Sequence, residues 1–189
     1  LSGNKYIVLI KHPLSSELNH AHDQMLLTLE SLKVFCLKNK FQTICIPSNS
    51  DPGNFMMKRV INSFHNEDWF VKLDTLPRAE FINLIRNTYA IVGNSSMGIL
   101  EAPHYKLPVV NIGNRQKGRL NAGNVEFIDY NKQKIISSIE KACLDKDYRS
   151  KINKLVNPFG DGTAATKIRK AIESVKLDDK KWYIKRKLC

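Results

Sequence analysis

Short apolar runs alternate with longer amphipathic segments along this chain. Residues 6–10 (YIVLI) form a continuous apolar run bounded by polar residues, which is typical of a strand buried on both faces of a parallel sheet. Comparable runs predict further strands at residues 41–46, 69–73, 89–92, 108–112 and 124–128. Because the intervening segments can hold crossover helices, the pattern predicts an α/β fold with a doubly wound, Rossmann-like parallel sheet.

Helical periodicity is clearest in residues 19–39, where Met25, Leu29 and Leu32 recur at intervals of three or four positions. Asn39 is a plausible stop signal for that helix. Similar patterns predict helices at residues 55–64, 78–87, 97–105, 132–144 and 164–175. Residues 1–175 therefore read as one domain, followed by a basic, amphipathic tail at residues 176–189.

The stretch from Tyr89 to Asn124 reads as strand, small polar turn, helix and strand, which is a crossover unit. Its turn is residues 93–96 (GNSS). Backbone N–H groups at the start of a helix have no partner within the helix, and the helix dipole favours anions there. With the hydroxyls of Ser95 and Ser96 added, the turn suits a phosphate group. The alternative is an ordinary turn in which a serine caps the helix.

Three other features add to this site. His12 precedes a proline at the expected end of the first strand, and ligands of open α/β sheets bind beyond the carboxyl ends of strands. Asp51 lies in a turn-rich loop after the second strand, where it could contact a ligand or cap the next helix. Arg115 shares a glycine-framed loop with two further cations, which suits a diphosphate.

Several motifs occur in a characteristic order: an HP pair at His12, GNSSxGxxEAP from Gly93, PVVNIGxRQxGR from Pro108, GNV from Gly123 and NPFGDGxAAxKI from Asn157. Together they resemble the C-terminal half of the hydrolysing UDP-N-acetylglucosamine 2-epimerases, which include members of the sialic-acid and legionaminic-acid pathways. The resemblance implies one Rossmann-like half of a two-domain, GT-B-type architecture, with UDP bound in the cleft between the halves.

The resemblance also implies roles for individual residues. His12 would act beside the substrate's diphosphate, as the catalytic contribution of this half. The loop with Asn49, Asp51 and Gly53 matches PNxDxG, which in the family lies near uridine. UDP would be bound by Asp51, Asn94, Ser95, Ser96, Glu101 and Arg115. Glu101 would accept hydrogen bonds from the ribose hydroxyls, and Leu73 and Leu76 are possible contacts of the base, with core packing as an equal alternative.

The reaction implied is loss of UDP from a UDP-linked 2-acetamido sugar by elimination, followed by hydration with inversion at C2. The family's catalytic carboxylates belong to the N-terminal half, so this chain alone is expected to bind UDP weakly and to turn over nothing. The tail is expected to cross to that half, where Trp182 and Tyr183 would pack, and the full-length enzyme is expected to be a homodimer. No metal or redox cofactor is implied.

Composition leaves two alternatives open. The formal charge of +12 would suit a module that binds nucleic acid or another polyanion, although no nucleic-acid motif accompanies it. A GT-B glycosyltransferase would share the nucleotide-binding half. Neither a membrane-spanning run nor a signal-peptide pattern is present, and Cys36 and Cys45 stand in apolar surroundings, as reduced core thiols do. A cytoplasmic protein is therefore expected.

Overall fold

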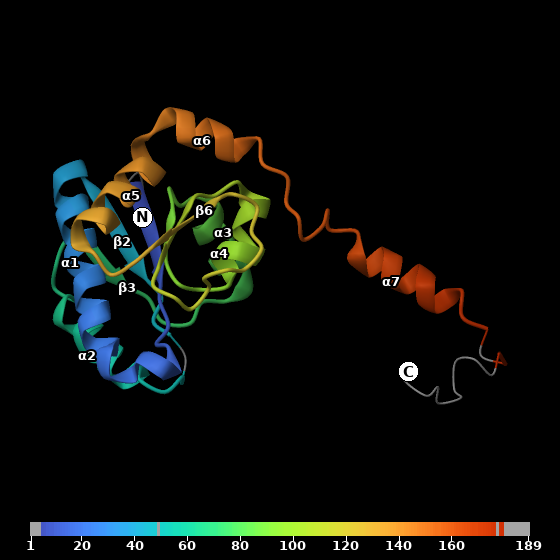
Figure 1. Cartoon of the computed structure of the whole chain (residues 1–189), viewed down its shortest axis with the longest axis horizontal. Coiled ribbons are helices and arrows are strands. Elements are labelled where there is room, and N and C mark those ends of the chain that lie inside the picture. Colours follow the sequence, from blue (N-terminus) through green and yellow to red (C-terminus); the bar gives the residue numbers. More distant parts are fainter. Residues whose placement is uncertain (1–4, 49, 177, 180–189) are drawn as a thin grey trace. The chain divides into compact units, whose positions relative to one another are not determined.

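The computed structural model describes residues 5–48, 50–176 and 178–179 of the chain (Figure 1). It divides into two compact units, residues 1–156 and residues 157–189. Asn49, Trp182 and Tyr183, for which the sequence suggests roles, lie outside the described residues. The division of the chain into a domain of residues 1–175 and a tail that crosses to another domain stays a prediction.

The first unit contains one six-stranded sheet in which all strands are parallel, with the order β3-β2-β1-β4-β5-β6. Chain order runs outward in both directions from the neighbouring strands β1 and β4, which therefore form the topological switch point. The strands are β1 (Lys5–Ile10), β2 (Phe41–Cys45), β3 (Phe70–Lys72), β4 (Ile91–Gly93), β5 (Val109–Ile112) and β6 (Val125–Ile128). All six predicted strands are present.

Helices cover both faces of the sheet (Figure 1). One apolar cluster joins the sheet to α1, α2 and α5, and a second cluster joins it to α3 and α4. The sequence did not indicate α6, because this short helix buries only Ile152. The helices are η1 (Ser15–His20), α1 (Ala21–Asn39), α2 (Asn54–Ser63), α3 (Arg78–Arg86), α4 (Met97–Leu100), η2 (Ala102–Tyr105), α5 (Lys132–Leu144), α6 (Lys146–Asn153) and α7 (Ala164–Glu173).

Side chains of β1 alternate between the two clusters. Ile7 and Leu9 pack with α1, whereas Val8 and Ile10 pack with the α3 side. The chain continues into Lys11, which is only 1% exposed. Burial lowers the pKa of Lys11 to about 7, although the charge of Glu17 opposes this shift. An ionisable amine thus lies in the interior directly beside His12.

The second unit contains α7 and the turn that leads into it. The carboxylate of Asp161 accepts hydrogen bonds from the backbone N–H and the hydroxyl of Thr163. These bonds lower the pKa of Asp161. The segment from Gly160 to Gly162 thus forms the turn that leads into α7.

Cys36, Cys45 and Cys143 are buried free thiols, as expected for the first two. Burial raises the pKa of each to about 12, so all three remain protonated at neutral pH. Within the part of the chain that the structure describes, none of the helices is both long and apolar enough to cross a membrane.

Gly93 allows β4 to approach β1 closely at the switch point. Its φ is +135°, and a Cβ atom there would lie 2.0 Å from the carbonyl oxygen of Ile10. We expect Gly93→Ala to reduce the free energy of unfolding by more than about 3 kcal/mol, because backbone strain adds to a clash with a backbone atom. Gly118→Ala is the matched control: its φ is +80° but nothing lies within 4 Å. It should cost only about 1 kcal/mol. Equal losses in urea unfolding would contradict the prediction.

Lys11→Met is expected to stabilise the fold by about 2 kcal/mol at pH 7, because it removes a buried charge. The unfolded chain holds the Lys11 proton up to its ordinary pKa of 10.5, but the folded chain only to about 7. Wild-type stability from this group therefore rises between these pH values, so the advantage of the variant should shrink toward pH 10. Urea unfolding across pH 6–10 measures it. If the stability advantage of Lys11→Met over wild type grew with pH instead, burial would not be destabilising the charged form of Lys11.

Candidate functional site

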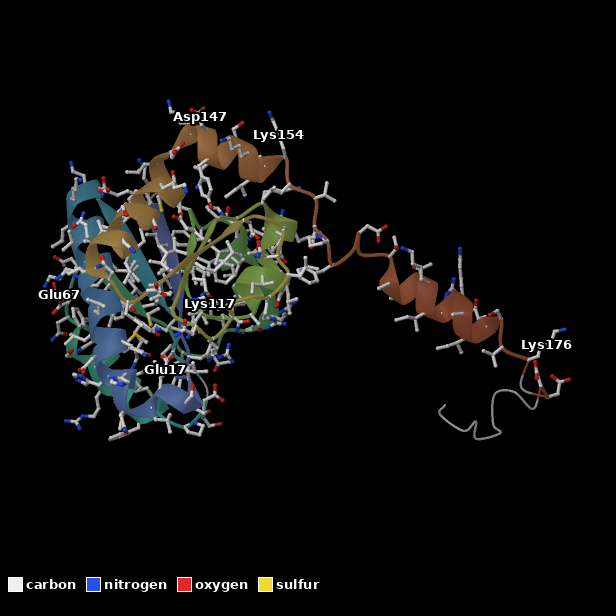
Figure 2. The ribbon with its side chains drawn as sticks, in the orientation of Figure 1. Glu17, Glu67, Lys117, Asp147, Lys154 and Lys176 are labelled. Atoms are coloured by element: carbon white, nitrogen blue, oxygen red, sulfur yellow. The ribbon has the colours of Figure 1, made fainter. Side chains whose placement is uncertain are left out.

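The loops that follow β1, β4 and β5 meet at the carboxyl edge of the sheet, beside the switch point. They carry His12, Ser95 and Arg115 respectively. In Figure 2, Glu17 lies toward this end of the first unit and Asp147 lies toward the opposite end, with Lys117 between them. The tertiary structure therefore gathers predicted site residues that are far apart in sequence.

Asn94 joins the first two of these loops. Its Oδ1 accepts a hydrogen bond from the backbone N–H of His12 at 2.7 Å, and its Nδ2 donates to the carbonyl of His12 at 2.8 Å. The side chain is 2% exposed. Its amide thus extends the pairing of β4 with β1 by one further pair of bonds beyond Gly93. A contact between Asn94 and UDP stays a prediction, since the structure assigns this side chain to holding His12.

The third loop is attached to the same residue. Nη1 of Arg115 and Nε2 of Gln116 each donate to the backbone carbonyl of Asn94 at 3.1 Å. Nη1 of Arg119 in turn donates to Oε1 of Gln116 at 2.7 Å. Arg115 is half-buried, so its remaining N–H groups can face a ligand while one is fixed. Gln116 and Arg119 shape the loop that presents Arg115.

The turn at Ser95 and Ser96 leads into a shorter helix than the sequence suggests. The predicted helix at residues 97–105 ends after one turn as α4 and resumes as the 3-10 helix η2. Pro103 explains the break, because it has no N–H with which to continue the α-helical ladder. A four-residue helix has a small dipole, so anion attraction must come mainly from individual N–H and hydroxyl donors.

Both serines are partly exposed. Oγ of Ser95 accepts weakly from the N–H of Met97 at 3.4 Å, while Ser96 makes no capping bond with its side chain. Among the hydrogen bonds of the described residues, none uses the backbone N–H groups of Ser95 and Ser96. These donors are compatible with the phosphate interpretation of the turn, which stays a prediction.

His12 lies between cations and one carboxylate. Its Nδ1 is buried, has no hydrogen-bond partner among the described residues, and lies 3.6 Å from Oδ2 of Asp51. Burial, Arg115 and Lys11 lower the pKa of His12, whereas Asp51 opposes this shift. The imidazole is therefore neutral at physiological pH, with one nitrogen able to donate and the other to accept a hydrogen bond.

Asp51 is placed beside His12 rather than at a helix cap. The N-cap of α2 is Gly53, and no side chain caps that helix. The alternative interpretation of Asp51 as a capping residue is therefore wrong. The carboxylate is 41% exposed and remains accessible to a ligand.

Glu101 lies at the junction of α4 and η2, 42% exposed. Its carboxylate forms a loose ion pair with Arg78 at 3.5 Å, which sequence reasoning did not anticipate. Leu73 and Leu76 pack against the apolar cluster on the α3 face, which supports their packing role. No group of three or more possible metal-binding side chains occurs among the described residues.

Lys11 is a further residue that the sequence interpretation missed. The alternation of side chains along β1 could have indicated it. If the strand continues by one residue, Lys11 falls on the same buried face as Ile7 and Leu9. Its chemical partners could not be foreseen, because Tyr130 is 119 positions away.

Comparisons with known proteins agree on one family. A sequence model described as UDP-N-acetylglucosamine 2-epimerase matches residues 1–173. The chain is 32% identical over 173 residues to the UDP-N,N'-diacetylbacillosamine 2-epimerase (hydrolyzing) of Legionella pneumophila, which covers 92% of this chain and 44% of that protein. The chain thus spans about half the length of the curated relatives it matches.

Solved structures confirm the fold class. The UDP-GlcNAc 2-epimerase of Methanocaldococcus jannaschii matches with a TM-score of 0.71 and 17% identity, over 92% of this chain and 46% of that one. The Neisseria meningitidis enzyme bound to UDP-GlcNAc matches with a TM-score of 0.68 and 19% identity, over 92% and 45%. The sheet is therefore the expected Rossmann-like half of a GT-B-type architecture, and the expected resemblance to the C-terminal half is confirmed.

The family match includes every motif on which the resemblance rests, from the HP pair at His12 to the Gly-Asp-Gly turn. It extends over most of the described residues of both units. The chain belongs to the UDP-N-acetylglucosamine 2-epimerase family.

Proposed function

We propose that this chain is the UDP-binding half of a hydrolysing UDP-N-acetylglucosamine 2-epimerase. The observation that carries the proposal is the convergence of three loops on Asn94, which brings His12, the Ser95–Ser96 donors and Arg115 to one edge of the sheet. Donors from three loops around one point suit the several oxygens of a diphosphate.

Each side chain has a distinct role in this proposal. The N–H groups and hydroxyls of Ser95 and Ser96 hold one phosphate, and Arg115 supplies a permanent charge to the other. Glu101 exchanges its loose pairing with Arg78 for the ribose hydroxyls. Asp51 faces the uridine side and keeps His12 oriented.

The reaction starts with elimination of UDP from a UDP-linked 2-acetamido sugar. Elimination requires a base at the C2–H bond and stabilisation of the departing diphosphate. This chain supplies the second requirement: Arg115 and the serine turn bind the charge that develops on the leaving group. A neutral His12 donates a hydrogen bond from its N–H to a diphosphate oxygen as the bond to the sugar breaks.

Hydration of the resulting double bond, with inversion at C2, releases the epimerised sugar. The relative from Legionella pneumophila bears the designation hydrolyzing, which favours this outcome over return of the sugar to UDP. The base belongs to an N-terminal half of the enzyme, so this chain by itself binds UDP weakly and is inactive. In full length the enzyme is a cytoplasmic homodimer without metal or redox cofactor.

A glycosyltransferase that uses the same nucleotide-binding half is the second candidate, and free epimerised sugar among the products of the full enzyme would exclude it. The family match over residues 1–173 favours the epimerase. A basic module for polyanions, the third candidate, has the formal charge of +12 in its favour but does not explain why donors converge on Asn94.

Titration calorimetry tests the nucleotide preference of this chain. We expect heat from UDP, with a dissociation constant weaker than about 10 µM because half of the cleft is missing. AMP should give a much smaller response, since it lacks the second phosphate that Arg115 would bind. Equal responses to the two nucleotides, or none to UDP, would refute the proposed function.

Glu101→Ala separates ribose recognition from phosphate recognition. The substitution should weaken UDP binding by about tenfold, which is the effect expected when hydrogen bonds to a charged group are lost. It should leave the affinity for pyrophosphate nearly unchanged. Glu80→Ala, which removes an exposed carboxylate from the first turn of α3, is the control. Equal weakening of UDP and pyrophosphate by Glu101→Ala would show that Glu101 does not contact the ribose.

A further inference from the structure

A continuous chain of hydrogen bonds runs beneath the site. Nζ of Lys11 donates to the hydroxyl of Tyr130 at 2.8 Å, and this hydroxyl donates to Oε1 of Gln24 at 2.9 Å. Nε2 of Gln24 donates to Oε2 of Glu17 at 2.6 Å, and Nδ2 of Asn114 donates to Oε1 of Glu17 at 3.2 Å. Five residues from five separate segments therefore share one network, called here the Lys11–Glu17 network.

The network connects a cation and an anion that do not touch. Among the described residues, Lys11 has no carboxylate within ion-pair distance, and each step from it toward Glu17 has its donor on the Lys11 side. Tyr130 and Gln24 thus link the ammonium group of Lys11 to the carboxylate of Glu17 through hydrogen bonds that all run in the same direction. Such chains strengthen cooperatively in surroundings of low dielectric constant, where every unmet donor or acceptor is costly.

The far end of the network reaches the loop that presents Arg115. Asn114 directly precedes Arg115, so its bond to Glu17 anchors that loop to η1. Tyr130 supports the same loop from below: a Cβ atom on Gly113 would lie 2.5 Å from the Tyr130 hydroxyl. The backbone can rest against this hydroxyl because residue 113 is glycine.

The near end of the network lies beside His12. Lys11 is its neighbour in sequence, and its charge lowers the pKa of His12. The titratable and charged groups that bear on Lys11 are Glu17 from η1, Tyr130 from the loop after β6, and His12, which itself feels Arg115 and Asp51. Water cannot screen Lys11, which is 1% exposed, so its charge is effective at longer range than that of a surface lysine.

We propose that the Lys11–Glu17 network belongs to the diphosphate-binding apparatus: Tyr130 is a positioning residue for the Arg115 loop, and Lys11 adds a buried positive charge behind His12. The proposal rests on the proposed UDP-binding function. It explains why a destabilising buried lysine stands at the end of β1, where an apolar side chain would pack without cost.

Calorimetry with UDP at pH 6 and pH 8.5 tests both roles. Lys11→Met should weaken UDP about tenfold at pH 6, as expected for loss of a charge roughly 10 Å from the ligand in partly buried surroundings. At pH 8.5 the wild-type lysine is mostly neutral, so the ratio of the two affinities should approach one. The ionisation of UDP affects both proteins and does not change this comparison.

Tyr130→Phe should weaken UDP binding at both pH values, because it removes the hydrogen-bond partner of Lys11 Nζ and of Gln24 Oε1 and so breaks the connection between Lys11 and the Arg115 loop. Tyr148→Phe is the matched control: Tyr148 also packs against the larger core cluster, but it belongs to α6 and its ring lies against Lys141 of α5. It should leave UDP affinity unchanged.

Two further results separate this proposal from a purely structural role of the network. The pKa of His12, followed by NMR, should rise in Lys11→Met because a neighbouring cation is lost. A Lys11→Met protein that is more stable than wild type, yet binds UDP more weakly at pH 6, would establish the functional role.

Unchanged UDP affinity in both Lys11→Met and Tyr130→Phe, while wild type binds UDP, would overturn the network proposal alone. Failure of the wild-type chain to bind UDP would overturn the proposed function and the network proposal with it.

Discussion

The double hydrogen bond between the side chain of Asn94 and the backbone of His12 is the contact on which the candidate site depends. Parallel strands cannot share a tight turn, so the loops beyond β1 and β4 have no covalent reason to stay together. The amide of Asn94 supplies one donor and one acceptor in the spacing of a peptide group. It therefore continues the sheet for one more residue and fixes both loops.

The backbone carbonyl of the same residue then fixes the third loop, through Arg115 and Gln116. A cation that is already held by one bond loses less conformational entropy when a ligand arrives than a free surface arginine does. Gly93 makes the arrangement possible, because any Cβ atom at that position would collide with β1. Packing of the strands and geometry of the site are thus set by adjacent residues.

Charge distribution at the site favours an anion at the expense of stability. Burial lowers the pKa of Lys11. Burial and repulsion by the charges of Arg115 and Lys11 lower the pKa of His12. The negative charge of a diphosphate would relieve this repulsion, and the energy released would contribute to the affinity for the diphosphate. Glu17 and Asp51 offset part of this cost, Glu17 through the Lys11–Glu17 network and Asp51 through its proximity to His12.

The sequence by itself determined the six strands, most helices, the loops that carry the candidate residues and the family, because these depend on local periodicity and on short motifs. Only the tertiary structure decided which side chains hold the site loops together and which remain accessible to a ligand. Asn94 and Asp51 looked equivalent as ligand contacts in the sequence. In the structure, Asn94 is buried and bonded to the backbone of His12, whereas the carboxylate of Asp51 is accessible to solvent. The break after α4 and the pairing of Lys11 with Tyr130 were also beyond local patterns. The first depends on how a proline is accommodated in a packed turn, and the second joins residues 119 positions apart, whose proximity arises from the order of strands in the sheet.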